Sequence, residues 1–140
     1  MKQSAIELHD SIVSAIDLHE EAVVIVFSHA YIHISNGVPG RDPGSGWSQG
    51  AELTIRNANT DNLPRGWPCE IYSGCLQVGD KEYENEIPIP LSTQDKTCLR
   101  MKVCCPDGDY YSVEIRGLGA QLTLLGEPRY VEEFPGSRGC

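Results

Sequence analysis

Positive charge is scarce in this chain of 140 residues. Eleven lysine and arginine residues are outnumbered by 20 aspartate and glutamate residues, which gives a formal net charge of -9 at pH 7. A nucleic-acid-binding protein needs cations that displace the counterions of the phosphates, and the sequence shows no basic stripe. An anionic membrane surface would also repel the chain. We therefore expect neither nucleic acid nor a membrane as partner, and favour a basic protein or peptide.

Long hydrophobic runs are missing too. No segment approaches the roughly 18 apolar residues of a membrane-spanning helix. The first residues, MKQSAIELHD, lack the apolar run of a secretory signal peptide. We therefore expect a cytoplasmic protein, and because cysteines stay reduced in that compartment, we expect its six cysteines to be free thiols.

The six cysteines also lack the spacing of a zinc site. Cys69 and Cys75 are six positions apart, as are Cys98 and Cys104, whereas paired zinc ligands are separated by about two to four residues. Six residues along a strand place two sulfur atoms about 20 Å apart. Under oxidation, Cys69 or Cys75 can pair with Cys98 or Cys104, and the sequence leaves the pairing open. We expect Cys140 to be an exposed terminal thiol.

Local motifs of the common enzyme classes are absent as well. The chain contains no Gly-x-Ser-x-Gly elbow, dinucleotide fingerprint, phosphate loop or His-Glu-x-x-His sequence. The paired carboxylates of a glycosidase leave no local motif, so the enzyme question stays open, with these absences weighing against an enzyme. We expect no cofactor.

Most of the sequence consists of short segments in which apolar and polar residues alternate. Clusters drawn from 14 glycines and nine prolines separate them, which is typical of many short strands. We predict one all-β domain over residues 1–140, either an antiparallel β-sandwich or a partly open barrel of about eight strands. Residues 127–140 offer little to bury and are predicted to form a C-terminal tail.

The N-terminal quarter favours a β-hairpin. Apolar residues alternate from Ile12 to Leu18, the polar segment HEE follows, and residues 23–34 are rich in β-branched and aromatic side chains. A helix over residues 4–18 is the alternative, because some of the same apolar residues also recur at helical spacing.

Further strands follow along the chain. Residues 97–116 are the clearest hairpin, because Asp-Gly separates two alternating runs. The segment IPIPL (87–91) contains two prolines, which restrict it to a sheet edge or an extended connection. Single strands are predicted over residues 51–57, over 69–78 with a bulge at Ser73-Gly74, and over 120–126.

The segment 35–50 is predicted to be a long irregular loop and the main contact surface. Structureless loops of this length are uncommon and often functional. Tryptophan and arginine are enriched at binding hot spots, and this loop and the next one each contain both. The alternative is that Trp47 and Trp67 cover the ends of the core. The predicted contact residues are Arg41, Asp42, Trp47, Gln49, Arg65 and Trp67.

An acidic segment is predicted to extend this contact surface. Glu82, Glu84 and Glu86 alternate in GDKEYENE and would share one face of a strand. Such carboxylates would steer a basic partner towards the surface and form its electrostatic rim. The alternative is a charged edge strand that prevents aggregation.

The histidines are concentrated in the first quarter of the chain. They are His9, His19, His29 and His33. The segments SAIELHDSIV and SAIDLHEEAV agree at six of ten positions and place His9 beside Asp10 and His19 beside Glu20. One interpretation is a duplicated metal site formed by these four residues. The other is two similar pieces of β-structure, in which HAYIH cannot chelate one ion because its two imidazoles lie about 13 Å apart along a strand.

The opening segment ELHDSIVSAIDLHEEAVVIVF also shows a family resemblance. With its Leu8-His9-Asp10-Ser11 stretch, it resembles small bacterial β-rich proteins, some of which are grouped with the immunity proteins of polymorphic toxin systems. That resemblance implies a non-enzymatic protein that binds a partner. We therefore expect a small acidic cytoplasmic protein-binding module. The alternative is a small metal- or ligand-binding β-protein that uses the N-terminal histidines.

Overall fold

Antiparallel β-strands make up the whole of the described fold. The computed structural model describes residues 2–136 and contains no helix within them, so it has none in that range that could cross a membrane. The expected all-β, antiparallel class is confirmed. The strands are β1 (Gln3–His19), β2 (Ala22–Ser35), β3 (Gly44–Arg56), β4 (Asn59–Asp61), β5 (Cys69–Val78), β6 (Lys81–Glu84), β7 (Glu86–Ile89), β8 (Ser92–Cys104) and β9 (Tyr110–Phe134).

A single sheet bends back on itself into a partly closed ring. Its strand order is β6-β5-β8-β9-β3-β2-β1-β7, and β4 pairs with β9 beside this path. Within residues 2–136, the strand pairing of β1 with β5 that closes the ring consists of Ile12 with Glu70 and Val13 with Cys69. Of the two arrangements expected, the partly open barrel is therefore the nearer one. The IPIPL segment contributes β7, which lies at one end of the strand path, as predicted.

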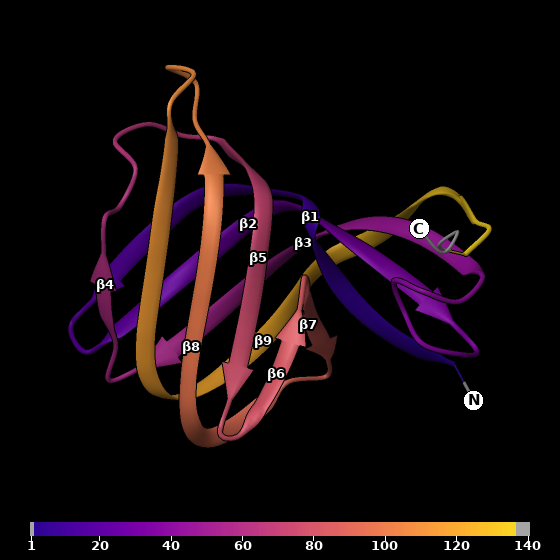
Figure 1. The fold of residues 1–140 in the computed structure, drawn as a ribbon, viewed down its shortest axis with the longest axis horizontal. Helices are drawn as coiled ribbons and strands as arrows, with labels where there is room; N and C mark the ends of the chain where they lie inside the picture. Colours follow the sequence, from indigo (N-terminus) through magenta and orange to yellow (C-terminus); the bar gives the residue numbers. More distant parts are fainter. Residues whose placement is uncertain (1, 137–140) are drawn as a thin grey trace.

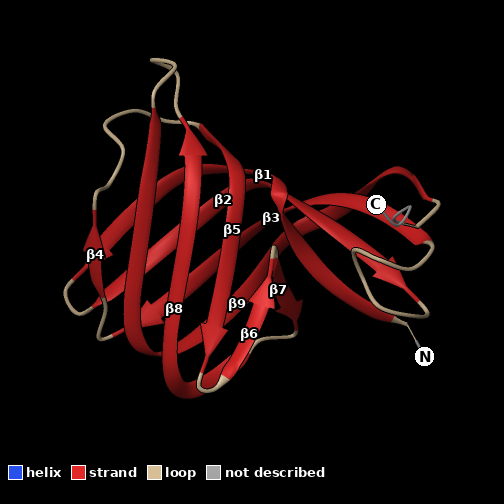
Figure 2. Cartoon of the chain, in the orientation of Figure 1, coloured by secondary structure: helices blue, strands red, loops and turns tan. Residues whose placement is uncertain are grey.

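The molecule consists of a two-layered body and a projecting arm (Figure 1, Figure 2). In the body, β5, β8 and the first half of β9 lie across β1, β2 and β3. The arm contains residues 3–7, 30–35, 44–49 and 129–134 and projects to the right. Apolar side chains of both layers fill the body, because alternation directs every second residue of each strand inward. The largest of them include Ile25, Phe27, Leu53, Ile55, Ile71, Leu76, Leu99 and Ile115.

Irregular register marks the places where strands pass from the body into the arm. The pairing of β1 with β2 is interrupted between Glu7 and Ile12. Inside this bulge the Ser11 hydroxyl donates to the Glu7 carbonyl at 2.7 Å and accepts the Tyr31 N–H at 3.0 Å. A bulge bends a strand and increases its twist, so the Leu8–Ser11 stretch turns β1 towards the arm.

The hairpin predicted for the N-terminal quarter is confirmed, and the helix over 4–18 is wrong. Glu20, at a φ of 48°, lies in the turn of this hairpin. The two ten-residue segments therefore do not form a duplicated site. The first ends in the β1 bulge, whereas the second runs to the end of β1 and through the turn.

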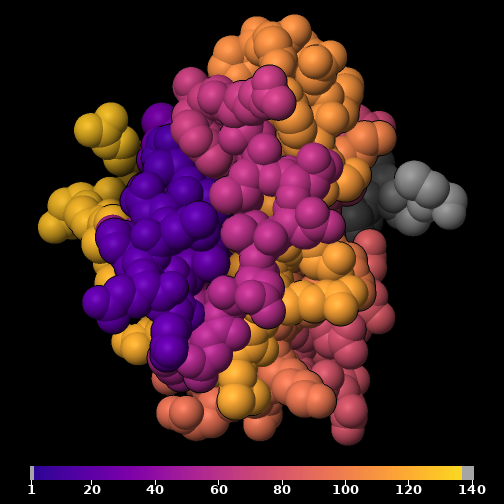
Figure 3. Space-filling view, turned by 90° about the vertical axis from the view of Figure 1, so that its left-hand side faces the viewer, coloured from indigo at the N-terminus to yellow at the C-terminus, as the bar shows by residue number. Residues whose placement is uncertain are grey.

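The turn of the first hairpin also anchors the segment that leads into β4. The Ala58 N–H donates to the Glu21 carbonyl at 2.9 Å. Figure 3 shows this side of the molecule, where the indigo first hairpin lies beside the magenta segment that contains β4. The loops on this side are thereby attached to the body rather than to the arm.

Two predicted irregular segments are largely strand. β3 begins at Gly44, so only residues 36–43 form the loop that was expected over 35–50. Residues 127–134 belong to β9, where Tyr130 pairs with Trp47, although most of their side chains are exposed. Strand pairing in the arm orders this end of the chain despite its small buried surface. Residues 137–140, with the expected terminal thiol of Cys140, lie outside the described residues.

The expectation of six thiols is wrong, because Cys69 and Cys105 form a disulfide. The sequence analysis offered Cys98 or Cys104 as the partner of Cys69, whereas the structure pairs it with Cys105. Alternation along β8 turns Cys104 outward, whereas Cys105, just after the strand, is buried beside Cys69. Among the described cysteines, Cys75, Cys98 and Cys104 are free. The expected bulge in β5 is present within one position of Ser73.

Candidate binding site

A pocket of about 350 Å³ lies between the arm and the β6–β7 segment. We call it the acidic pocket, and its polar lining residues include Glu7, His33, Arg41, Glu82, Glu84 and Glu86. β6 and β7 are the two end strands of the sheet, and the turn between them brings both ends together here. Asn85 in this turn accepts the Leu8 N–H at its carbonyl at 2.9 Å and the His9 N–H at its side chain at 2.8 Å. The β1 bulge therefore positions the acidic segment.

Two carboxylates of the acidic pocket come from directly paired positions of neighbouring strands. Glu7 of β1 and Glu86 of β7 are cross-strand partners, and both are half-buried. Burial raises the pKa of Glu86 and is the largest cause of the raised pKa of Glu7, with repulsion from Asp10 next. Like charges placed opposite each other destabilise a sheet. The fold therefore keeps a charge repulsion in this pocket that a cation from outside would relieve.

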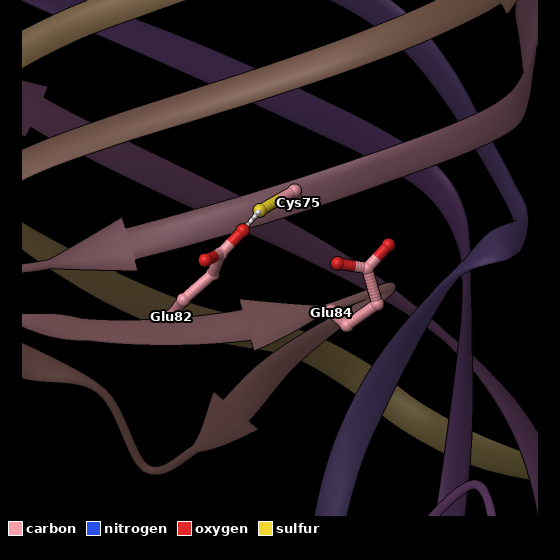
Figure 4. A group of neighbouring side chains, drawn as sticks. All are labelled: Cys75, Glu82 and Glu84. Atoms are coloured by element: carbon pink, nitrogen blue, oxygen red, sulfur yellow. Dashed lines mark hydrogen bonds between the residues drawn. The ribbon is translucent and has the colours of Figure 1, made fainter.

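Glu82 and Glu84 project from β6 beside the Cys75 thiol (Figure 4). The thiol donates to a Glu82 carboxylate oxygen at 3.1 Å. In the described part of the chain, these three side chains form the group of potential ligand atoms that lie close enough together to hold a metal ion. Burial, followed by the hydrogen bond to Glu82, raises the pKa of Cys75 to about 11. Because metals bind the thiolate rather than the thiol, this group is a weak candidate for a metal site.

The loop 36–43 forms an ordered wall of the acidic pocket. The Asp42 carboxylate accepts the Val38 N–H at 2.6 Å, and this hydrogen bond is the largest cause of the lowered pKa of Asp42. The Gly40 N–H donates to Nδ1 of His33. Asp42 is therefore committed to holding the loop, while Arg41 lines the pocket beside it.

His33 forms the buried base of this wall. Its ring lies edge-on to Phe134 with the centroids 4.1 Å apart, and the side chain is 1 % exposed. Burial lowers the pKa of His33, so the imidazole is neutral at pH 7. Its Nε2 has no hydrogen-bond partner within residues 2–136.

The structure brings four of the predicted contact residues together, with Asp42 beside them in the loop 36–43, and places the other four elsewhere. Arg41, Glu82, Glu84 and Glu86 all line the acidic pocket. Trp47 and Gln49 line a smaller apolar pocket of about 230 Å³ together with Ile32 and Ile34. Because Ile32 and Ile34 flank His33 in β2, alternation places this apolar pocket on the opposite face of the arm.

The second predicted loop lies elsewhere. Trp67 packs against the core beside the disulfide residue Cys69, and Arg65 is exposed on the same loop. This loop follows β4 on the far side of the body from the arm (Figure 1). The alternative that both tryptophans cover the core describes the structure better than a shared contact surface does, because Trp47 also packs against the core.

The histidine-based metal site is not assembled. His9 and His19 lie in the same strand, and ten residues of a strand span about 33 Å. Nδ1 of His9 lies 3.2 Å from Asp10, and Nδ1 of His29 lies 3.3 Å from the Ser28 hydroxyl. The residues His9, Asp10, His19 and Glu20 therefore cannot share one ion.

Glu7 was not predicted as a site residue, and His33 was named only among the histidines of the alternative metal- or ligand-binding protein. Each lies in a segment that is predicted to be a strand, and neither has a local motif that indicates this pocket. Only the pairing of β1 with β7 brings Glu7 opposite Glu86. The pairing of β1 with β2 likewise brings Tyr31 opposite Glu7.

The chain was compared with protein families, curated proteins and solved structures. No protein-family model, curated protein or solved structure matches the chain.

Proposed function

We propose that this protein binds a basic segment of another protein in the acidic pocket. The observation that carries the proposal is the pair of half-buried carboxylates, Glu7 and Glu86, held directly opposite each other. A lysine or arginine side chain placed between them would replace repulsion by two charge-assisted hydrogen bonds. Glu82 and Glu84 would provide the exposed rim that steers the partner.

Several features support a protein partner over a small cation. The pocket is open to an ordered loop and to two edge strands, which offers contact area beyond a single side chain. The net charge of -9 extends the attraction to a basic surface. The resemblance of Leu8–Ser11 to immunity proteins supports one setting, in which the protein neutralises a basic toxin.

We also propose that this binding occurs in the cytoplasm. The sequence favours the cytoplasm, whereas a disulfide such as Cys69–Cys105 is typical of oxidising compartments. Alkylation of thiols in denaturant at the moment of cell lysis would distinguish the two, because unfolding exposes both buried cysteines and a cytoplasmic protein would have Cys69 and Cys105 labelled.

The proposal is tested with a fluorescently labelled hexalysine peptide, whose binding is followed by anisotropy at low and at physiological ionic strength. We expect the triple variant Glu82→Gln, Glu84→Gln, Glu86→Gln to bind about tenfold more weakly than the original chain, because three attractive charges are lost. Salt should weaken binding to the original chain for the same reason. Affinity capture from a lysate of the source organism, washed at low and then high salt, would identify the natural partner.

The matched control removes three exposed carboxylates that do not line the pocket. These are Glu20→Gln, Glu21→Gln and Glu127→Gln. Equal weakening by the two triple variants would show that the peptide responds to net charge alone, and the acidic pocket would not be the binding site.

A further inference from the structure

A second groove, of opposite charge, crosses the outer face of β8 and β9. It has a volume of about 570 Å³. We call it the basic groove, and its polar lining residues include Asn57, Asn59, Gln77, Lys96, Arg100 and Arg116. The residues that line it, all within the described part of the chain, include no aspartate or glutamate. In a chain with a net charge of -9, such a lining is a local excess of positive charge.

Strand alternation and pairing create this cluster of cations. Lys96 and Arg100 project outward from β8, and both are exposed. Arg116 lies on β9 opposite Cys98, so that its side chain falls between theirs on the same face. Three positive charges separated by up to 20 positions in the sequence thereby gather over two neighbouring strands.

One carboxylate at the edge of the groove partly neutralises the cations. Oε1 of Glu114 lies 3.2 Å from Nε of Arg100 and 2.7 Å from a terminal guanidinium nitrogen of Arg116. Within residues 2–136, Lys96 forms no ion pair. Among Lys96, Arg100, Arg116 and Glu114, positive charge exceeds negative charge by two, while Asp80 and Asp95 lie in the adjoining pocket beside Lys96. Both arginine side chains remain more than half exposed, at 53 % and 66 %, so they can turn to a ligand.

The chemistry of the groove favours carboxylates on a short peptide. Guanidinium groups bind carboxylates through paired hydrogen bonds, and the amides of Asn57, Asn59 and Gln77 can bind a peptide backbone. A long polyanion such as nucleic acid fits less well. Asp80 and Asp95 lie around Lys96 in the adjoining pocket, and they would repel phosphates that continued past the groove.

We propose that the basic groove binds an acidic peptide segment of a partner protein. Leu118, which lines the groove and is 50 % exposed, provides an apolar contact for such a segment. This site shares no lining residue with the acidic pocket, so the two proposals stand or fall separately. A protein that carried both sites would bind partners with patches of both signs.

The test uses the full chain and a fluorescently labelled hexaglutamate peptide at about 0.15 M salt, where a screening length of about 8 Å suppresses the repulsion from distant acids. We expect the double variant Lys96→Gln, Arg116→Gln to weaken binding about fivefold. The variant Glu114→Gln should strengthen binding about two- to threefold, because the internal competitor for Arg100 and Arg116 is removed.

The matched control, Lys2→Gln with Arg129→Gln, removes two exposed cations elsewhere and should leave the affinity unchanged. Opposite responses to the loss of Lys96 and Arg116 and to the loss of Glu114, with an unchanged control, would support the groove. Equal weakening by both double variants, or no binding of hexaglutamate to the original chain, would overturn the proposal. So would a hexathymidylate oligonucleotide that bound more tightly than hexaglutamate and lost its affinity in the groove variant.

Discussion

At the scale of single residues, the paired carboxylates Glu7 and Glu86 destabilise the fold when both are charged, and a bound cation would remove this cost. Burial raises the pKa of both carboxyls above the ordinary value of 4.5. The folded state therefore binds more protons than the unfolded state between this value and the raised one. Stability contributed by these groups is greatest at pH values below 4.5 and falls as the pH rises through that interval.

We predict that Glu7→Gln stabilises the protein at pH 7 by about 0.5 kcal/mol, because it removes a like-charge pair between adjacent strands. At pH 4 the same change should have little effect, since both carboxyls are then largely protonated. Urea denaturation at the two pH values measures this difference. The exposed Glu21→Gln serves as the control. A loss of stability at pH 7 in Glu7→Gln would mean that the carboxylate has a stabilising partner.

At the scale of an element, the arm depends on glycine at particular positions of β3. A Cβ atom at Gly44 would collide with the backbone carbonyl of Ile34 in the paired strand β2, so one of the two strands would have to shift. At Gly50 in the same strand, the nearest atom would lie at an ordinary contact distance of 3.6 Å. The close approach of the two backbones therefore explains why position 44 is glycine, but it does not explain the glycine at position 50.

We predict that Gly44→Ala lowers the free energy of unfolding by about 1–3 kcal/mol, as expected for an overpacked site. Gly50→Ala should be neutral or slightly stabilising, because alanine restricts the unfolded chain more than glycine does. Thermal denaturation of the two variants provides the comparison. Similar melting temperatures would show that the arm can move apart at Gly44 without cost.

Hairpins were the elements that could be predicted, because their signal is local. The alternation around Asp-Gly specified β8 and the start of β9, and the polar break after Leu18 specified the turn between β1 and β2. The extent of β3 and β9 could not be predicted. Their arm residues are rich in glycine and polar side chains, and pairing with each other holds them in strand geometry.

At the scale of the whole molecule, the disulfide links β5 to the end of β8, next to the place where β5 pairs with β1 and the ring closes. Cys69 is one of the few residues through which β5 pairs with β1, and its disulfide ties the same position to Cys105 after β8. The two cysteines are 36 positions apart. Closing a loop of this length stabilises a fold by about 3–4 kcal/mol in the chain-entropy model.

We therefore predict that reduction lowers the free energy of unfolding by about 3–4 kcal/mol. Urea denaturation with and without reductant measures the difference, and Cys98→Ala should respond to reductant as the original chain does. Identical unfolding curves, with Cys69 and Cys105 alkylated once the protein is unfolded without reductant, would show that the two cysteines are thiols.

The sequence by itself determined the all-β class, the two hairpins and the acidic segment at residues 82–86, because alternation and turn chemistry act between neighbouring residues. Tertiary structure alone decided which charges meet. The pairing of β1 with β7 places Glu7 against Glu86, and the pairing of β8 with β9 gathers Lys96, Arg100 and Arg116 into a basic groove. Such pairings depend on how the whole sheet closes, since a one-residue shift in register would turn each of these side chains to the other face.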